Sequence, residues 1–209
     1  MHGFARIRTW SLDSTAQLSD GRTQVVLVLT DDAETRGMWP FSFRLELKVV
    51  VGATLEVTLL TENRGNDPFV CDEAFHTYFN VTDVTHCAVQ GLNGIMYRDR
   101  LRGDTRAVQV GELTIQAEMV NAYMDAPKTI DLVDQLSNRT IRIEQQGLGA
   151  VVVWNPWETT AAANPELKGV WQQFVCVESA NCLDRHLTVL PGAAHRSVLS
   201  CQAPILFQY

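Results

Sequence analysis

A chain of 209 residues is long enough to bury a sizeable hydrophobic core. With 46% hydrophobic residues, 20% charged residues and no long uninterrupted apolar run, it is predicted to be a soluble globular protein, neither disordered nor membrane-spanning. The net charge of -7 argues against nucleic acid as the main partner, because such binding draws most of its free energy from basic residues that neutralise phosphates.

The N-terminal residues and the cysteines both indicate a reducing compartment. No basic stretch followed by an apolar segment opens the chain, so we expect no secretory signal and a cytoplasmic location. The cysteines are five, an odd number, and no two have Cys-x-x-Cys spacing, which argues against a disulfide framework and against a zinc site. We therefore expect small core residues at Cys71, Cys87, Cys176, Cys182 and Cys201.

Alternating apolar and polar residues predict a series of β-strands. The clearest case is residues 41–49, where apolar side chains occupy the odd positions and mostly charged ones the even positions, as in a strand with one buried and one wet face. In chain order the predicted strands are residues 25–29, 41–49, 53–61, 140–144, 151–154, 173–177, 187–190, 196–201 and 204–207. Turn residues occur at 20–21, 93–94, 103–104 and 191–192. Many strands with few helical stretches predict an all-β fold of packed antiparallel sheets, and the absence of a linker or repeat predicts one domain over residues 1–209.

Residues 97–106 are rich in arginine. They could form an anion site, but the interspersed acids and the Gly-Asp turn favour a solvated loop.

A single imidazole, His76, lies among aromatic residues in the segment 75–79 (FHTYF). Aromatic neighbours lower the local dielectric and shift the pKa of a histidine, as happens at sites of acid–base catalysis. A half-buried histidine that only hydrogen-bonds a neighbouring carbonyl fits the same pattern, so the segment leaves a structural role open.

Three other segments carry side chains that are suited to binding or catalysis. Residues 2–6 (HGFAR) end in Arg6, whose planar fork suits a phosphate or carboxylate. Trp154 and Asn155 follow a buried-looking strand and could form a stacking wall for a sugar, or only the capped end of a core strand. Glu178 ends an apolar strand, where desolvation would raise its pKa and make it a useful base near neutral pH.

Taken in order, segments 75–79, 151–157 (VVVWNPW) and 175–178 (VCVE) resemble the hexose-6-phosphate mutarotases, also called glucose-6-phosphate 1-epimerases, of the galactose mutarotase superfamily. Residues 2–6 and 91–97 resemble further stretches of the same family, so the resemblance spans nearly the whole chain. It implies an antiparallel β-sandwich of the galactose mutarotase-like type, with the sugar in a cleft on a concave sheet face. The implied reaction interconverts the α and β anomers of an aldose 6-phosphate, with glucose 6-phosphate as the expected substrate.

The resemblance also assigns roles to individual residues. Glu178 would take a proton from the anomeric hydroxyl and His76 would supply one to the ring oxygen, while Arg6 would contact the phosphate. His2, Trp154 and Asn155 are the other expected substrate-binding residues. No metal or redox cofactor is called for. Because the acid and the base must flank one sugar carbon, we expect them on neighbouring strands and roughly 5–8 Å apart, too far to pair directly.

The chain departs from the family pattern at three places. The HGFAR stretch begins at residue 2, whereas in the family it follows several strands and a loop with another arginine, so we expect a sandwich that lacks its N-terminal edge. Family members are monomers, but the exposed sheet edges would allow self-association here. Val120 stands where the family has a sugar-binding acid, and Ser179-Ala180 replaces Pro-Gly after the glutamate. These departures support the alternative of a weak or inactive sugar-phosphate-binding or regulatory protein on the same fold.

Overall fold

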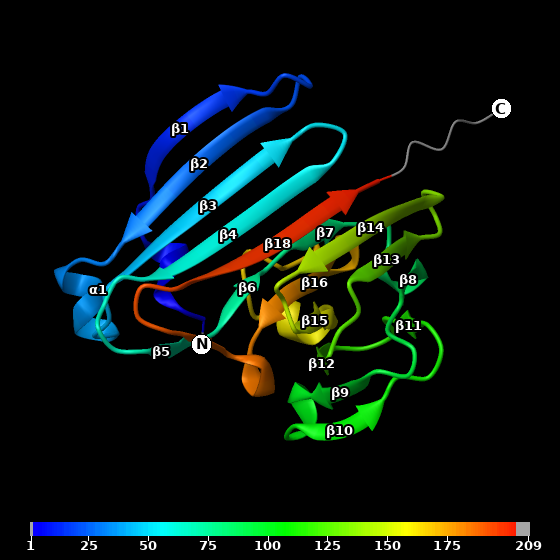
Figure 1. The fold of residues 1–209 in the computed structure, drawn as a ribbon. Helices are drawn as coiled ribbons and strands as arrows, with labels where there is room; N and C mark the ends of the chain where they lie inside the picture. Colours follow the sequence, from blue (N-terminus) through cyan, green and yellow to red (C-terminus); the bar gives the residue numbers. More distant parts are fainter. Residues whose placement is uncertain (1, 204–209) are drawn as a thin grey trace.

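Two large antiparallel sheets make up most of residues 2–203, the part of the chain that the computed structural model describes (Figure 1). This architecture confirms the predicted all-β fold. The nine-stranded sheet has the order β1 (Ser11–Gln17), β2 (Thr23–Thr30), β3 (Phe43–Val51), β4 (Leu55–Asn63), β18 (Ala194–Gln202), β14 (Arg139–Gln146), β13 (Thr129–Asp134), β8 (Cys87–Gln90) and β11 (Leu113–Thr114).

The seven-stranded sheet carries the candidate site. Its strand order is β10 (Thr105–Val108), β9 (Met96–Asp99), β12 (Met119–Met124), β15 (Ala150–Asn155), β16 (Phe174–Asn181) and β6 (Glu73–Phe75), with β7 (Tyr78–Asn80) also paired to β16. A small third sheet joins β17 (Leu187–Val189) and β5 (Phe69–Cys71). The helical segments are short: α1 (Ala33–Met38), α2 (Trp157–Ala162) and the single turns η1 (Phe4–Ile7), η2 (Val84–His86), η3 (Arg100–Arg102), η4 (Trp171–Gln173) and η5 (Leu183–Arg185). None of the helices in residues 2–203 is long and apolar enough to cross a membrane.

Eight of the nine predicted strands coincide with β2, β3, β4, β14, β15, β16, β17 and β18. The ninth, residues 204–207, lies outside the described residues. The predicted turn at residues 20–21 joins β1 to β2, and Gly21 has the positive φ of 85° that such a turn favours.

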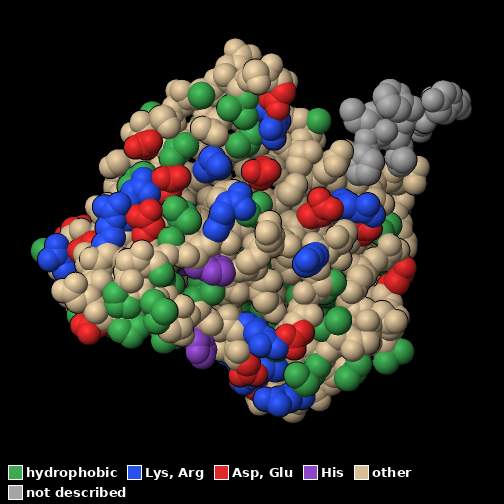
Figure 2. All heavy atoms as spheres, in the orientation of Figure 1, with side chains coloured by type: hydrophobic (Ala, Val, Ile, Leu, Met, Phe, Trp, Pro, Cys, Tyr) green, Lys and Arg blue, Asp and Glu red, His purple; other side chains and the backbone are tan. Residues whose placement is uncertain are grey.

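The prediction of a solvated loop over residues 97–106 is correct for the exposure of the segment but wrong for its structure. The segment forms a β9–β10 hairpin around η3, because the acids between the arginines bind them: Arg98 and Arg100 both donate to Asp104. Arginine and acidic side chains lie intermixed over this hairpin at the bottom of the view in Figure 2. Pairing with Asp99 and Asp104 of the hairpin and with Asp184 of η5 neutralises most of the positive charge that a polyanion would need.

The alternation of side chains along β15 and β16 divides the molecule into a core side and a cleft side. Val151 and Val153 of β15, with Val175 and Val177 of β16, are fully buried in the main hydrophobic cluster between the two large sheets. Each fully buried valine contributes about 1.5–3 kcal/mol of hydrophobic free energy relative to an exposed one. The intervening residues face the opposite side of the sheet, where the cleft lies.

Strands β3 and β4 do not have the simple buried and wet faces that their alternation predicts. Most of their residues are half-buried on both faces. Leu45 and Leu59 line the cleft, and β18 is the neighbour of β4 in the same sheet. The apolar face of these strands therefore borders an open space and is only partly covered.

Strand β1 forms one edge of the nine-stranded sheet, and all seven of its residues are exposed. The pairing register with β2 shifts between Leu12 and Ser14, so Asp13 sits at a bulge. A bulge with a charged residue blunts an edge strand against pairing with another chain. Self-association through sheet edges stays a prediction.

Candidate active site

A cleft of about 1110 Å³ lies on the outer face of the seven-stranded sheet and extends to the N-terminal segment and to β3 and β4. This volume is ample for a sugar phosphate, since sites for small molecules commonly measure about 300–1,000 Å³. Side chains from both large sheets contribute to its walls. Five of the six predicted site residues line it: His2, Arg6, His76, Trp154 and Glu178.

The strand register explains how His76 and Glu178 come together. Phe75 of β6 pairs with Ser179, and Tyr78 of β7 pairs with Cys176. Both pairs follow the same antiparallel register, which carries His76, in the break between β6 and β7, directly opposite Glu178. Adjacent cross-strand side chains stand about 4.5–5.5 Å apart at Cβ, so their tips can touch.

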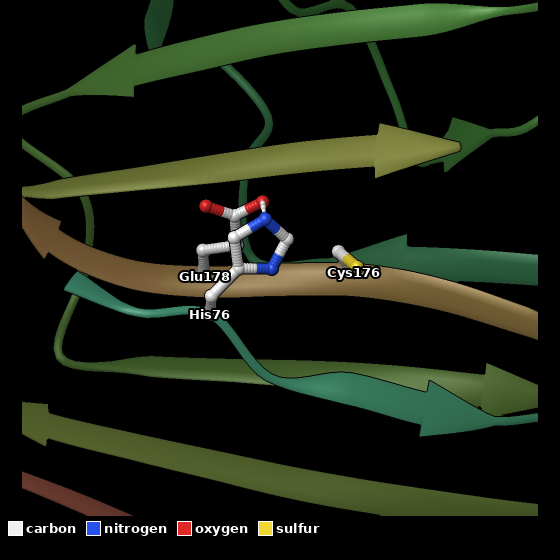
Figure 3. Close-up of side chains that lie close together, drawn as sticks. All are labelled: His76, Cys176 and Glu178. Carbon is white, nitrogen blue, oxygen red and sulfur yellow. Dashed lines mark ion pairs between the residues drawn. The ribbon is translucent and has the colours of Figure 1, made fainter. Parts of the chain in front are cut away.

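The expected separation of 5–8 Å between the two groups is wrong. His76 Nε2 lies 3.4 Å from Glu178 Oε1, and the two side chains approach one another from the break between β6 and β7 and from β16 (Figure 3). The prediction assumed that one sugar ring separates acid and base. The register instead makes them direct cross-strand neighbours, with the cleft above both.

Burial shifts the protonation of this pair. The Glu178 side chain is only 9% exposed, and desolvation by burial raises the pKa of its carboxyl to about 7. Desolvation, with smaller contributions from the nearby His2 and Arg6, lowers the pKa of the His76 imidazole. Both shifts favour the neutral forms. In the low-dielectric wall, the free-energy cost of desolvating either charge exceeds the free energy gained from the contact between the two groups. Near neutral pH the carboxyl group can therefore both release and accept a proton.

Aromatic rings hold the imidazole in place. Tyr78 stacks on His76 with ring centroids 5.0 Å apart and planes 10° apart, and Trp154 meets the imidazole edge-on at 5.9 Å. His2 approaches it from the N-terminal segment at 5.1 Å. Sequence reasoning did not assign Tyr78 a place in the site. Its position two residues after His76, on the same face of an extended segment, was the available signal.

Arg6 lies at the cleft on η1 and is exposed. Within residues 2–203 no hydrogen bond or ion pair engages its guanidinium, in contrast to Arg8, which pairs with Glu34. The neighbouring Phe4 and Ala5 pack against a second apolar cluster and so anchor this segment to β2 and β3. The buried residues of this second cluster are Leu29, Phe43, Phe69 and Val189. Arg6 thus lies on an anchored segment at the cleft, and its guanidinium has no partner among residues 2–203.

Asn155 does not reach the cleft, and the expected substrate contact at this residue is corrected to a structural one. Its side chain is fully buried, and its amide donates to the backbone carbonyls of Trp171 and Phe174 at 2.8 Å each. Its carbonyl oxygen accepts from the backbone N–H of Trp157, a residue with a positive φ of 55°. Because Asn155 follows Trp154 on a strand, its side chain points to the opposite face.

Val120 and Arg100 also line the cleft. Val120 pairs with Trp154 across β12 and β15, so a carboxylate at this position would face the cleft beside the tryptophan. Arg100 belongs to the β9–β10 hairpin and is held by Asp104.

These features define an antiparallel sandwich of the galactose mutarotase-like type with a carboxyl–imidazole pair in a cleft on one sheet. The structure of a candidate mutarotase, YeaD from Salmonella typhimurium, superposes with a TM-score of 0.88 at 25% identity, covering 96% of this chain and 66% of that one. A galactose mutarotase related enzyme from Lactobacillus acidophilus shares the fold with a TM-score of 0.79 at 13% identity, covering 97% and 73%.

Residues 1–202 match the model of the aldose 1-epimerase family, and the chain belongs to this family. A relative from Cenchrus ciliaris, named as a candidate glucose-6-phosphate 1-epimerase, is 31% identical over 212 residues, covering 97% of this chain and 64% of the relative. A relative from Escherichia coli (strain K12) with the same name is also 31% identical, over 196 residues, covering 93% and 65%. The chain thus spans slightly less than two thirds of the length of these curated relatives.

Proposed function

We propose that this chain interconverts the α and β anomers of an aldose 6-phosphate, with glucose 6-phosphate as the substrate. The observation that carries the proposal is the contact between Glu178 and His76 at 3.4 Å on the wall of a cleft. Arg6 lines the same cleft. The names of the relatives point to the same sugar phosphate.

The reaction needs only proton transfers. The Glu178 carboxylate takes the proton of the anomeric hydroxyl, and the protonated His76 imidazole gives its proton to the ring oxygen as the bond between C1 and that oxygen breaks. The products of this step are an open-chain aldehyde, a protonated carboxyl and a neutral imidazole. After rotation about the C1–C2 bond, the same transfers in reverse close the ring on the other face of the aldehyde.

The pKa shifts of the pair set the reactive protonation state. With a carboxyl pKa of about 7 and an imidazole pKa lowered by burial, the reactive form with ionised carboxylate and protonated imidazole is the minor form of the singly protonated pair. Proton exchange across the 3.4 Å contact connects the two forms. A base with a pKa near 7 matches the operating pH and so favours proton transfer.

Arg6 supplies recognition of the phosphate in this proposal. A sugar with its C1 at the Glu178 carboxylate could extend its 6-phosphate along the cleft toward η1, where a guanidinium forms bidentate hydrogen bonds with phosphate oxygens. Such a local cation is needed because the net charge of the protein, -7, repels an anionic substrate.

The decisive experiment measures anomer exchange of glucose 6-phosphate by magnetisation transfer between the two anomeric proton signals. We expect the purified chain to accelerate exchange above the buffer rate, and His76→Asn or Glu178→Gln to remove most of the acceleration. The double variant should lose little more than the worse single variant, because the two groups act in one step. A wild-type chain that leaves exchange at the buffer rate contradicts catalysis.

A second function, binding of a sugar phosphate without catalysis, is favoured by one observation. Val120 lines the cleft where the family pattern has an acid, so one hydroxyl contact to the sugar is absent. This function would be supported over the first if calorimetry detected binding of glucose 6-phosphate while anomer exchange stayed at the buffer rate.

A further inference from the structure

Cys176 adds a third donor atom to the acid–base pair. It lies two residues before Glu178 on β16 and so projects from the same face of the strand. One ring nitrogen of His76, the sulfur of Cys176 and one carboxylate oxygen of Glu178 all lie within 4.8 Å of one another (Figure 3). The proposed proton transfers make no use of this thiol.

Nitrogen, thiolate and carboxylate donors together are the ligand set of zinc. Zinc bonds to these atoms measure about 2.0–2.3 Å, which puts the donors of a tetrahedral site roughly 3.3–3.8 Å apart. The present separations exceed that range by no more than about 1 Å, within reach of small side-chain rotations. Three protein ligands with a fourth position open to solvent are typical of accessible zinc sites.

Two features of the trio favour a cation. Glu178 is buried, and within residues 2–203 its only ion-pair partner is His76, which carries a charge only when it is protonated. In addition, His76 Nδ1 is buried and has no hydrogen-bond partner among the described residues. A divalent ion would offset the cost of the buried carboxylate and use a ring nitrogen of the imidazole.

We propose that His76, Cys176 and Glu178 form a binding site for a thiophilic divalent cation, with zinc as the best fit and the fourth coordination position facing the cleft. The bound ion occupies the acid and the base together. Inhibition of anomer exchange by zinc then follows, and this consequence alone rests on the proposed function. Binding of the metal itself does not depend on catalysis.

The thiol makes the binding pH-dependent. A cysteine thiol ordinarily keeps its proton at neutral pH. Zinc must displace this proton to bind the thiolate. We therefore expect affinity to rise with pH and about one proton to be released from the thiol for each ion bound.

The test uses untagged, metal-free protein titrated with zinc chloride by calorimetry in two buffers of different ionisation enthalpy, and with cobalt chloride by absorption spectroscopy. We expect one ion per chain, proton release, and a cobalt spectrum with a thiolate charge-transfer band and the strong visible bands of tetrahedral coordination. Cys176→Ser should abolish the charge-transfer band and weaken zinc binding by at least about 10-fold, a loss in the range seen when even outer-shell partners of metal sites are removed.

Cys182→Ser is the matched control, because Cys182 is a free thiol on the cleft wall, directly after β16, and lies outside the trio. It should leave both the band and the affinity unchanged. If Cys176→Ser fails to fold, as judged by circular dichroism, Glu178→Gln serves instead: zinc binding should weaken while the charge-transfer band persists. No zinc binding at millimolar concentration, or binding that is insensitive to Cys176→Ser and Glu178→Gln, would overturn the proposal.

Discussion

The acid–base chemistry of Glu178 is determined by its buried position in the fold. On an exposed strand its carboxyl would be an ordinary acid, but here it is buried on β16, between β15 and the short strands β6 and β7. The resulting pKa near 7 is useful for proton transfer and unfavourable for folding above that pH. The same burial therefore links the proposed activity to the stability of the protein.

This link can be measured as the pH dependence of unfolding. Because the folded-state pKa of Glu178 lies above the ordinary value of 4.5, folding binds its proton, so this group lowers the free energy of unfolding as pH rises from about 4.5 to about 7. Above pH 7 the loss is on the order of 3 kcal/mol. Glu178→Gln should therefore be more stable than the wild type at pH 8 by an amount of this order, and the difference should vanish below pH 4.5.

Urea unfolding of both proteins at several pH values checks this expectation, with Glu144→Gln as the control because Glu144 is exposed on β14. The His76 pKa is lowered, so its own effect runs the other way and removes stability as pH falls below 6.5. Because both proteins contain His76, the difference in stability between the wild type and Glu178→Gln reports the effect of the carboxyl. A Gln variant that is less stable than the wild type at pH 8 would contradict the assigned cost of burial.

Arg6 permits a test of substrate recognition that is separate from catalysis. Loss of a hydrogen-bonded charged group typically costs about 1.5–3 kcal/mol. We therefore expect Arg6→Ala to weaken binding of glucose 6-phosphate by about 10–100-fold and to leave binding of unphosphorylated glucose nearly unchanged. Calorimetry with both sugars is the measurement, and Arg102→Ala, in the β9–β10 hairpin away from the cleft, is the control. An equal loss for both sugars would make Arg6 a structural residue.

Among the strands and turns, the β14–β15 connection ties the two large sheets together through one glycine. The carbonyl of Gly147 accepts hydrogen bonds from Asn181 Nδ2 of β16 and from His195 Nε2 of β18, both at 2.7 Å. Gly147 has a φ of 73°, and a Cβ added there would lie 2.2 Å from the carbonyl oxygen of Arg196. Both the dihedral angle and the close backbone therefore require glycine.

Gly147→Ala should consequently destabilise the protein more than a glycine substitution in an open turn. Gly94→Ala is the matched control, since Gly94 has a similar φ of 80° but nothing within 4 Å of an added Cβ. We expect the control to lower the free energy of unfolding by about 1–2 kcal/mol because of the dihedral angle alone. Gly147→Ala should lower it by about 1–3 kcal/mol more because of the clash. Denaturant unfolding measures both, and equal losses would mean that the backbone near Arg196 yields freely.

For the protein as a unit, the main hydrophobic cluster contains residues from both large sheets, including Leu132 of β13, Ile143 of β14 and Val177 of β16. Neither sheet can therefore separate without exposing the same core. We expect one cooperative unfolding transition, as the single-domain prediction requires.

Tryptophan fluorescence and far-ultraviolet circular dichroism should report the same unfolding midpoint. The fluorescence probes are well spread, because Trp10 and Trp39 pack in the second cluster beside β2 and β3, while Trp157 and Trp171 pack against the main core. Two separate midpoints would show that the second cluster unfolds on its own and that the chain holds two stability units.

The sequence was sufficient for the fold class and for most of the long strands, and five of the six predicted site residues line the cleft, because period-two alternation and the short motifs are local properties of the chain. The prediction missed β1 and β5 to β13. Strands β1 and β10 are exposed throughout, charged residues interrupt β9 and β13, β5 to β8 and β11 have at most four residues, and the nearly all-apolar β12 does not alternate. The prediction misplaced Asn155, because one residue along a strand changes the face. The contact between His76 and Glu178, the place of Tyr78 and the proximity of Cys176 depend on the register of β6 and β7 against β16. That register joins segments about 100 residues apart, and it is set by the packing of both sheets on one core, which no local pattern encodes.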